Sequence, residues 1–357
     1  MKLAVKRASF IFLAFVMLTM SYGGVDAASE KVDATKEPSI YAHPIYIAPI
    51  DRATFIVGAL FDFRVELHEL KAMPKNVSVT VNGIPAETFF GRSFVRTNTY
   101  PDSLELTIEN VYFREPGTYT VSVQADDRTR TIHYDVIRPD DGEAKAKNII
   151  FFLGDGMGQP SITTARIMSR GITEGKPNGL LTMDTFEQRA TVITHGMDSI
   201  VTDSANAMSA YMTGHKTVVN AMGVYPDNRP DPLAKPKVEV MGEIMKRLGK
   251  SVGIVTTTEL QDATPAAVVS HTRRRETKAE ITEMFYQLKP EVMLGGGAAY
   301  FLPKSVPGSK RKDDKDFFRL FEQDGYRIVE NRAQLLQIDA KKTDRLLGLF
   351  SRVRYHV

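Results

Sequence analysis

The apolar run from Asn148 to Leu153 is the feature that most limits what this chain can fold into. Five of its six residues are apolar, and a strand with apolar side chains on both faces is typical of a parallel sheet covered by helices. The sequence Gly154-Asp-Gly-Met-Gly158 ends the run, and Pro160 follows where a helix can begin. The stretch predicts a buried strand, a tight loop and a helix.

The residues after this run continue to alternate between strand and helix patterns. An amphipathic helix is predicted over residues 238–248, and further strands are predicted at residues 251–256, 291–294, 326–330 and 346–350. This order predicts an α/β domain with a mostly parallel sheet over residues 148–357. Ligands of such sheets bind beyond the carboxyl ends of the strands, and Asp155 and Asp262 each follow a predicted strand within a short loop.

Residues 38–138 show a different pattern, in which apolar and polar residues alternate. Strands are predicted at residues 76–81, 103–109, 118–124 and 130–137, with Asn82-Gly83 as a hairpin turn. Short, evenly spaced strands predict a small all-β sandwich of immunoglobulin type, and no catalytic cluster is found within it. The polar residues 139–147 show no periodicity and are interpreted as a linker between the two domains.

Residues 1–28 have the composition of a secretory signal peptide. Lys6-Arg7 precedes a short apolar stretch from Ala8 to Tyr22, and Val25 and Ala27 are small residues suited to a cleavage site. A retained membrane anchor is the alternative. We therefore expect export to the periplasm or the cell exterior, with no membrane span after cleavage. The absence of cysteine excludes thiol chemistry and cysteine zinc sites, and a net charge of +3 gives no indication of nucleic-acid binding.

Ser204 stands at the start of a predicted helix that ends near Gly214. The serine can be a helix cap or a nucleophile, and the helix N-terminus would favour an anion such as phosphate. A nucleophilic serine needs a base or a metal ion. No Gly-x-Ser-x-Gly motif surrounds Ser204, so activation by a metal is favoured over a Ser-His-Asp triad.

Two further groups of residues suit a site for metal and phosphate. Asp155 lies between glycines, where a ligand or metal can approach closely, although it can also cap the next helix. Asp262 and Thr264 precede a helix predicted at Pro265 and offer hard oxygen ligands suited to Mg²⁺. Residues 273–275 are three arginines predicted two to three turns along that helix. One of them can bind phosphate, and a solvated basic face is the alternative for at least two.

Taken together, these segments resemble the alkaline phosphatase family from residue 148 to about residue 350. The resemblance rests on five segments in the expected order: Asn148–Gly158, Val201–Ala205, Thr213–Thr217, Glu259–Ala267 and Met293–Gly297. It implies hydrolysis of small phosphate monoesters through a transient phosphoserine, with an alkaline optimum, two Zn²⁺ ions and one Mg²⁺ ion. The resemblance leaves open whether the protein forms a homodimer.

The resemblance also implies a role for each matching residue. Asp155 would bridge a zinc and the magnesium, and Asp262 and Thr264 would belong to the magnesium site. Ser204 would be the serine that is phosphorylated, with its alkoxide bound to zinc. Arg275 would hold the phosphate.

Arg274 is the next candidate for the phosphate-binding arginine, should Arg275 lie elsewhere. A related sulfatase or phosphomutase of the same fold class is less favoured, and residues 204–208 do not match the Cys/Ser-x-Pro-x-Arg motif of common sulfatases.

The sequence departs from the family pattern in two ways. Asn206, Met208 and Ser209 replace very small residues after the serine. The later segments that supply most zinc ligands, an Asp-x-x-x-His segment and an Asp-His pair, are not found, and His356 is the only histidine after Gly297. These departures predict a C-terminally truncated chain. The alternative to an enzyme is therefore an inactive family member whose sandwich is a binding module.

Overall fold

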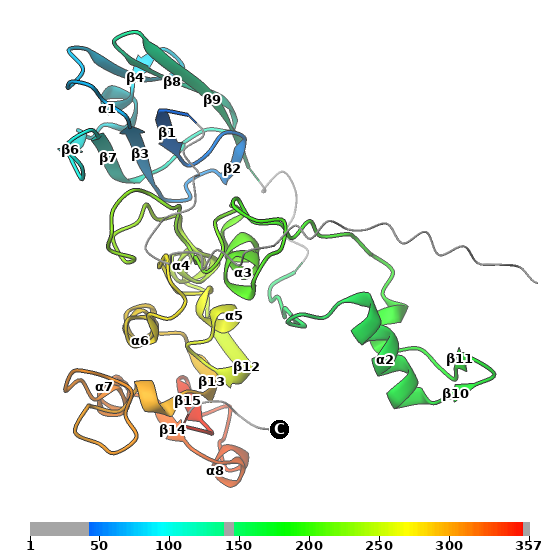
Figure 1. Cartoon of the computed structure of the whole chain (residues 1–357). Helices are drawn as coiled ribbons and strands as arrows, with labels where there is room; N and C mark the ends of the chain where they lie inside the picture. The colour runs from blue at the N-terminus through cyan, green and yellow to red at the C-terminus, as the bar shows by residue number, and fades with distance from the viewer. Residues whose placement is uncertain (1–42, 139–145, 353–357) are drawn as a thin grey trace, which may run out of the picture. The chain divides into compact units, whose positions relative to one another are not determined.

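The computed structural model describes residues 43–138 and 146–352 (Figure 1). The predicted signal peptide, most of the predicted linker and His356 lie outside the described residues. Two β-sheets are formed by residues 45–137, a two-stranded sheet by residues 172–177, and a four-stranded sheet by residues 253–349.

The first two sheets confirm the strands predicted from the alternating pattern. A four-stranded antiparallel sheet has the order β1 (Ile45–Ala48), β3 (Phe61–Leu67), β7 (Leu104–Val111) and β6 (Val95–Thr97). A five-stranded sheet has the order β2 (Ala53–Ile56), β9 (Arg128–Ile137), β8 (Gly117–Ala125), β4 (Val77–Val81) and β5 (Ile84–Pro85). The predicted hairpin joins β4 to β5, with φ of 49° at Asn82 and 79° at Gly83.

Both sheets contribute side chains to a single hydrophobic core. Along β9, buried and exposed residues alternate over the second half of the strand, so one face packs inward. Phe55 of β2 contacts the rings of Phe61 on β3 and Tyr134 on β9, at centroid distances of 4.6 and 5.2 Å. Tyr225 and Val238, from much later in the chain, complete this core. The immunoglobulin type of this region stays a prediction.

The predicted parallel sheet is present in the second half of the chain. Its strands lie side by side in the order β12 (Gly253–Glu259), β13 (Val292–Gly296), β15 (Leu346–Leu349) and β14 (Arg327–Val329), all parallel (Figure 1). The helix α6 (Lys278–Leu288) buries Ile281 and Phe285 in the core next to this sheet. The helix predicted over residues 238–248 is the shorter α4 (Met241–Arg247).

The remaining elements are α1 (Ala86–Phe90), α2 (Gln159–Arg170), β10 (Ile172–Thr173), β11 (Lys176–Pro177), η1 (Thr182–Thr185), α3 (Ser204–Thr213), α5 (Ala263–Ala266), η2 (Ala298–Tyr300), α7 (Phe317–Gln323) and α8 (Arg332–Leu336).

The prediction of a strand at residues 148–153 is wrong. These residues adopt no strand, and their apolar side chains are exposed, from 37% at Leu153 to 90% at Phe152. A parallel strand is buried only when a neighbouring strand supplies hydrogen bonds and helices cover both faces. Within the described residues, β12 is an edge strand that pairs only with β13. Residues 148–153 pair with no strand of this sheet. The helix predicted after them is present as α2, with proline in its first turn.

The β region and the later part of the chain are joined by backbone contacts. The amide of Asp62 donates to the carbonyl of Lys237 at 2.8 Å, and the amide of Lys237 donates to the Asp62 carboxylate at 3.0 Å. The amide of Glu239 donates to the carbonyl of Leu60 at 2.8 Å. Residues 237–239 thus lie along the start of β3.

His215 contributes a pH-dependent term to stability. It is 7% exposed, its Nδ1 lies 2.9 Å from the Tyr225 hydroxyl, and its ring contacts Phe55 edge-on at 4.9 Å. Burial lowers the pKa of His215 from 6.5 to about 4. Below pH 6.5 the unfolded chain therefore binds a proton that the folded chain does not. The folded state loses stability as the pH falls from 6.5 towards 4.

We expect this loss to reach on the order of 3 kcal/mol near pH 4, because one pKa unit corresponds to about 1.4 kcal/mol. Urea unfolding of the wild type and of His215→Gln at pH 7 and pH 4.5 measures it. The decrease should be smaller in His215→Gln, and the exposed His133→Gln should behave as the wild type. An equal decrease in His215→Gln would contradict the assignment.

Candidate active site

The helix α3 begins at Ser204, but Asp203 is the residue that caps it. The Asp203 carboxylate accepts from the amides of Ala205 and Asn206 at 3.1 and 3.2 Å, and the Asn206 side chain accepts from the amide of Asp203 at 3.1 Å. The interpretation of Ser204 as the helix cap is therefore wrong. Its hydroxyl is not used to start the helix. The predicted end at Gly214 is confirmed, with φ of 76°.

The residues that replace the small residues of the family pattern are packed behind Ser204. Asn206 takes part in the cap, Met208 is buried in the core, and the hydroxyl of Ser209 accepts from the amide of Gly223 at 3.0 Å.

Arg275 connects three of the polar side chains at this end of α3. One guanidinium nitrogen lies 2.9 Å from Ser204 Oγ and 3.3 Å from the Asp203 carboxylate, and the other donates to Asp262 at 2.6 Å. Burial alone would lower the pKa of Arg275, but its hydrogen bond to Asp262 and the charges of both aspartates raise it. The guanidinium is therefore held as a fixed positive charge against the serine oxygen.

The predicted helical position of the three arginines is wrong. The helix α5 ends at Ala266, and Arg275 lies in a later loop whose amide donates to the carbonyl of Asn220 at 3.0 Å. Arg273 is 5% exposed and donates to the carbonyl of Val219 at 2.8 Å, so it does not belong to a solvated face. Backbone groups of this loop bond to Asn220 and Met222, and these bonds replace those of a longer helix.

His271 and Glu243 support the loop that carries Arg275, and no sequence pattern indicated this pair. His271 Nδ1 lies 2.8 Å from the carbonyl oxygen of Gly223, and Nε2 lies 3.0 Å from Glu243. Burial alone would raise the pKa of Glu243, but the hydrogen bond and charge of His271 lower it. Gly223 has φ of 63°, and a Cβ there would lie 2.4 Å from the carbonyl oxygen of Ser270. The close approach requires glycine.

Asp155 is in contact with Thr264. The Thr264 hydroxyl donates to the Asp155 carboxylate at 2.7 Å, and Thr264 lies two residues beyond Asp262, which caps α5. Asp155 does not cap α2, because Gly158 stands at that position without a side-chain bond. The structure thus places the predicted residues in two pairs of contacts, Ser204 with Arg275 and Asp155 with Thr264, which are linked through Asp262.

The net charge of these residues is negative. Asp155, Asp203 and Asp262 carry three negative charges against the single positive charge of Arg275, so a phosphate dianion would be repelled without further cations. The Asp155 carboxylate and the Thr264 hydroxyl are hard oxygen donors of the kind that Mg²⁺ takes while keeping several waters.

Zinc does not fit the donors that are present. Zinc sites in proteins take about four ligands, mainly nitrogen and sulfur. Across residues 43–138 and 146–352, no group of three or more histidine, cysteine, aspartate or glutamate side chains could hold a metal ion. The predicted pair of zinc ions therefore has no ligand set in the described part of the chain.

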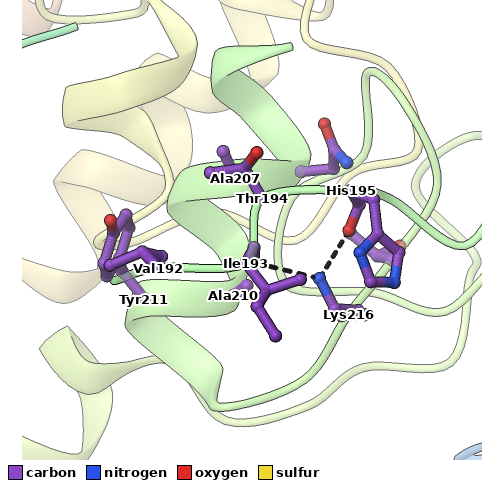
Figure 2. Close-up of a pocket in the computed structure, with 10 residues that line it drawn as sticks. Val192, Ile193, Thr194, His195, Ala207, Ala210, Tyr211 and Lys216 are labelled. Carbon is purple, nitrogen blue, oxygen red and sulfur yellow. Dashed lines mark hydrogen bonds between the residues drawn. The ribbon is translucent and has the colours of Figure 1, made fainter. Parts of the chain in front are cut away.

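A pocket of about 130 Å³ lies along the side of α3, and its lining includes Asn206 of the helix cap but not Ser204, Arg275 or Asp155. Its lining comes from Ala207, Ala210 and Tyr211 of the helix and from residues 192–195 (Figure 2). Lys216 donates to the carbonyl of His195 at 2.5 Å at its edge (Figure 2). Lys216 is thus bound to backbone and is not directed at Ser204.

The family model described as alkaline phosphatase matches residues 146–357, which is more than half of the chain. The chain belongs to the alkaline phosphatase family. This result confirms the resemblance drawn from the five sequence segments, and it includes the residues that form the contacts of Ser204, Asp155 and Asp262.

Three curated relatives show the extent of the similarity. Alkaline phosphatase H of Pseudomonas aeruginosa is 36% identical over 230 residues, which cover 58% of this chain and 46% of the relative. An alkaline phosphatase of Gadus morhua is 33% identical, with 58% and 50% covered, and streptomycin-6-phosphate phosphatase of Streptomyces griseus is 32% identical, with 59% and 49% covered. The chain spans about half the length of the curated relatives it matches. These relatives give no support to an inactive family member.

Two solved alkaline phosphatase structures are similar to part of this chain. The alkaline phosphatase of Thermus thermophilus has a TM-score of 0.39 at 32% identity, covering 45% of this chain and 31% of that one. A cold-active enzyme of Shewanella sp. has a TM-score of 0.43 at 26% identity, covering 57% of this chain and 46% of that one.

In the part of this chain that the structure describes, none of the helices combines the length and apolar character needed to cross a membrane.

Proposed function

We propose that this protein hydrolyses small phosphate monoesters, with Ser204 as the nucleophile. Membership of the alkaline phosphatase family supports a phosphoric monoester hydrolase. The observation that carries the proposal is the 2.9 Å contact between the Arg275 guanidinium and Ser204 Oγ. A fixed positive charge beside a serine hydroxyl favours its ionised form, which is the form that attacks phosphorus.

The proposed reaction has two displacement steps at phosphorus. Ser204 Oγ loses its proton to solvent and attacks the phosphoryl group, the bond from phosphorus to the ester oxygen breaks, and the alcohol leaves after taking a proton from water. Water then attacks the phosphoserine, the bond from phosphorus to Ser204 Oγ breaks, and inorganic phosphate is released. The serine recovers a proton from solvent.

Arg275 is the proposed binding group for the phosphate oxygens. The amides of Ala205 and Asn206 at the start of α3 are occupied by the Asp203 carboxylate, so they are not free to bind an anion. A planar guanidinium can donate two parallel hydrogen bonds to one phosphoryl group. When phosphate binds, we expect Arg275 to give up its longer contact, the one of 3.3 Å to Asp203, and to keep the one of 2.6 Å to Asp262.

Asp155 and Thr264 are the proposed ligands of Mg²⁺. When bound, this ion would supply positive charge that offsets the aspartates and the phosphate. The residues themselves hold the hydroxyl and carboxylate oxygens together at 2.7 Å. Export directed by residues 1–28 and a β-sandwich domain at residues 38–138 are proposed on the sequence pattern alone.

The test is to trap the phosphoryl group on the full chain. Protein supplied with Mg²⁺ and Zn²⁺ is mixed with an aryl phosphate, quenched in acid and digested, and the peptide containing Ser204 is analysed by mass spectrometry. A phosphorylated Ser204 is expected, and Ser204→Ala should show no label. The matched control is Ser169→Ala, whose hydroxyl bonds only to its own helix at 2.7 Å, and it should label normally. Phosphate release with an unmodified Ser204 would overturn the proposal, and so would the absence of release at every pH tested.

A further inference from the structure

A cavity of about 230 Å³ lies in the β region, between α1 and the loop that joins β7 to β8. Its apolar walls include Phe89 and Phe90 of α1 and Tyr119 of β8. Nothing in the proposed phosphatase chemistry uses this cavity, which is built from residues 89–119.

The aromatic walls are held in fixed positions by their neighbours. Phe89 and Phe90 contact each other edge to face at 5.0 Å, and Phe89 meets Tyr119 edge to face at 5.7 Å. The fully buried Phe113 lies behind them, 4.5 Å from the ring of Tyr119. The Tyr119 hydroxyl donates to the carbonyl of Glu115 at 2.9 Å, which fixes the loop. A flat ring can therefore enter a preformed aromatic site.

A β-bulge places Asn110 at the cavity. The pairing of β3 with β7 shifts register between Phe61 and Phe63, and Asn110 takes a left-handed backbone conformation with φ of 53°. Its amide donates to the carboxylate of Asp62 at 2.9 Å, which holds that conformation. The Asn110 carboxamide makes no hydrogen bond to any described residue. Bulges often direct a side chain to a binding site, and a free carboxamide can both donate to and accept from a ligand.

Two arginines give the cavity a positive rim. Arg92 donates to the carbonyl of Glu109 at 3.0 Å, and the Arg114 guanidinium lies 5.9 Å from the centre of the Tyr112 ring. Neither is within ion-pair distance of a carboxylate among the described residues. The acid in the lining, Glu115, forms an exposed ion pair with Arg138 at 3.1 Å, which offsets part of its charge. The cavity can therefore receive an anionic group from a ligand.

We propose that this cavity binds a nucleoside monophosphate. The base would stack against the aromatic walls, the Asn110 carboxamide would bond to the edge of the base, and the guanidiniums of Arg92 and Arg114 would hold the phosphate. Aromatic side chains stack with nucleobases, asparagine recognises adenine edges, and arginine binds phosphate through paired hydrogen bonds. A bare anion would make no stacking contact with the aromatic walls, and an uncharged ring would make no ionic contact with the arginines.

The experiment locates the ligand by photolabelling. The full chain carrying Ser204→Ala is irradiated with 8-azido-AMP, and the peptides are analysed by mass spectrometry. We expect label on the peptides that span residues 89–119, with AMP as an effective competitor. Adenosine and inorganic phosphate should each need a concentration roughly tenfold higher or more, because each lacks half of the contacts. Labelling requires no turnover, so its failure is distinct from failure of the proposed phosphatase activity.

The variants test the arginines directly. Arg114→Ala removes a side chain with no hydrogen bond to the described residues, so it should leave the fold unchanged and lower the affinity for AMP roughly tenfold or more. Arg96→Ala, an exposed arginine of β6 outside the lining, is the matched control and should label as before. Label confined to other peptides, equal labelling of Arg114→Ala, or equal competition by adenosine or phosphate would overturn the proposal.

Discussion

Ser204→Ala is expected to lower kcat for an aryl phosphate by roughly 10⁴-fold or more, with no loss of stability. Removal of a nucleophile eliminates the covalent route and leaves only catalysis by the surrounding charges. The fold should not depend on the hydroxyl, because Asp203 provides the helix cap and Ser204 Oγ bonds only to Arg275 among the contacts described. Alanine is also a better helix former than serine. Phosphate release and thermal unfolding of the same preparation measure the two effects.

Two companion variants separate the roles of the neighbouring residues. Arg275→Lys keeps the positive charge but loses the paired hydrogen bonds, so phosphoserine should still form while inhibition by inorganic phosphate weakens. Asp203→Ala should have the opposite effect, so that inhibition by inorganic phosphate becomes stronger. Loss of the helix cap should lower the free energy of unfolding by about 1 kcal/mol. A Ser204→Ala protein that retains wild-type kcat would exclude Ser204 as the nucleophile. One that loses activity together with its fold would show that the cap assignment is incorrect.

Local sequence was a good guide wherever a short stretch determines its own conformation. The hairpin at Asn82-Gly83 and the helix end at Gly214 depend on backbone angles that these residues favour. Four strand positions of the parallel sheet followed from short apolar runs. The helix cap could also have been found, since Asp203 and Asn206 have the spacing of a reciprocal cap.

Features that depend on distant partners could not be predicted in this way. The apolar run at residues 148–153 has the composition of a buried strand, but burial needs neighbours that its own sequence does not specify. Arg275 was expected on a helix, yet Asn220 and Met222 bind the backbone of its loop. The contact of Arg275 with Ser204 joins residues 71 positions apart, and only the family resemblance indicated it.

A second large effect is expected from a buried charge that no local pattern indicated. Asp227 is fully buried and lies 3.3 Å from Arg64, 3.0 Å from Lys235 and 2.5 Å from Arg229. Arg64 and Lys235 are themselves almost fully buried, at 1% and 2% exposure. Buried charges are tolerated only when they are paired and hydrogen-bonded.

Two further acids balance the cluster and connect the two parts of the chain. Glu66 lies 2.5 Å from Arg64 on β3, and Glu105 on β7 accepts from Asn228 at 2.5 Å. Three basic and three acidic groups are thus present, contributed by strands of the β region and by residues 227–235. Burial alone would raise the pKa of Glu105, but hydrogen bonds from Ser103 and Asn228 lower it.

Asp227→Asn should therefore destabilise the protein by about 3–5 kcal/mol, because it leaves buried cations without their shared partner. With a slope of about 1–3 kcal/mol per molar urea, the unfolding midpoint should fall by roughly 1 M or more. Circular dichroism in urea measures this shift.

Asp231→Asn is the matched control. This exposed aspartate of the same loop accepts from the amide of Leu233, as asparagine also can. Its free energy of unfolding should stay within about 0.5 kcal/mol of the wild type. Equal midpoints for Asp227→Asn and the wild type would mean that the shared acid can be removed without loss of stability. The cluster would then not hold the β region to the rest of the chain.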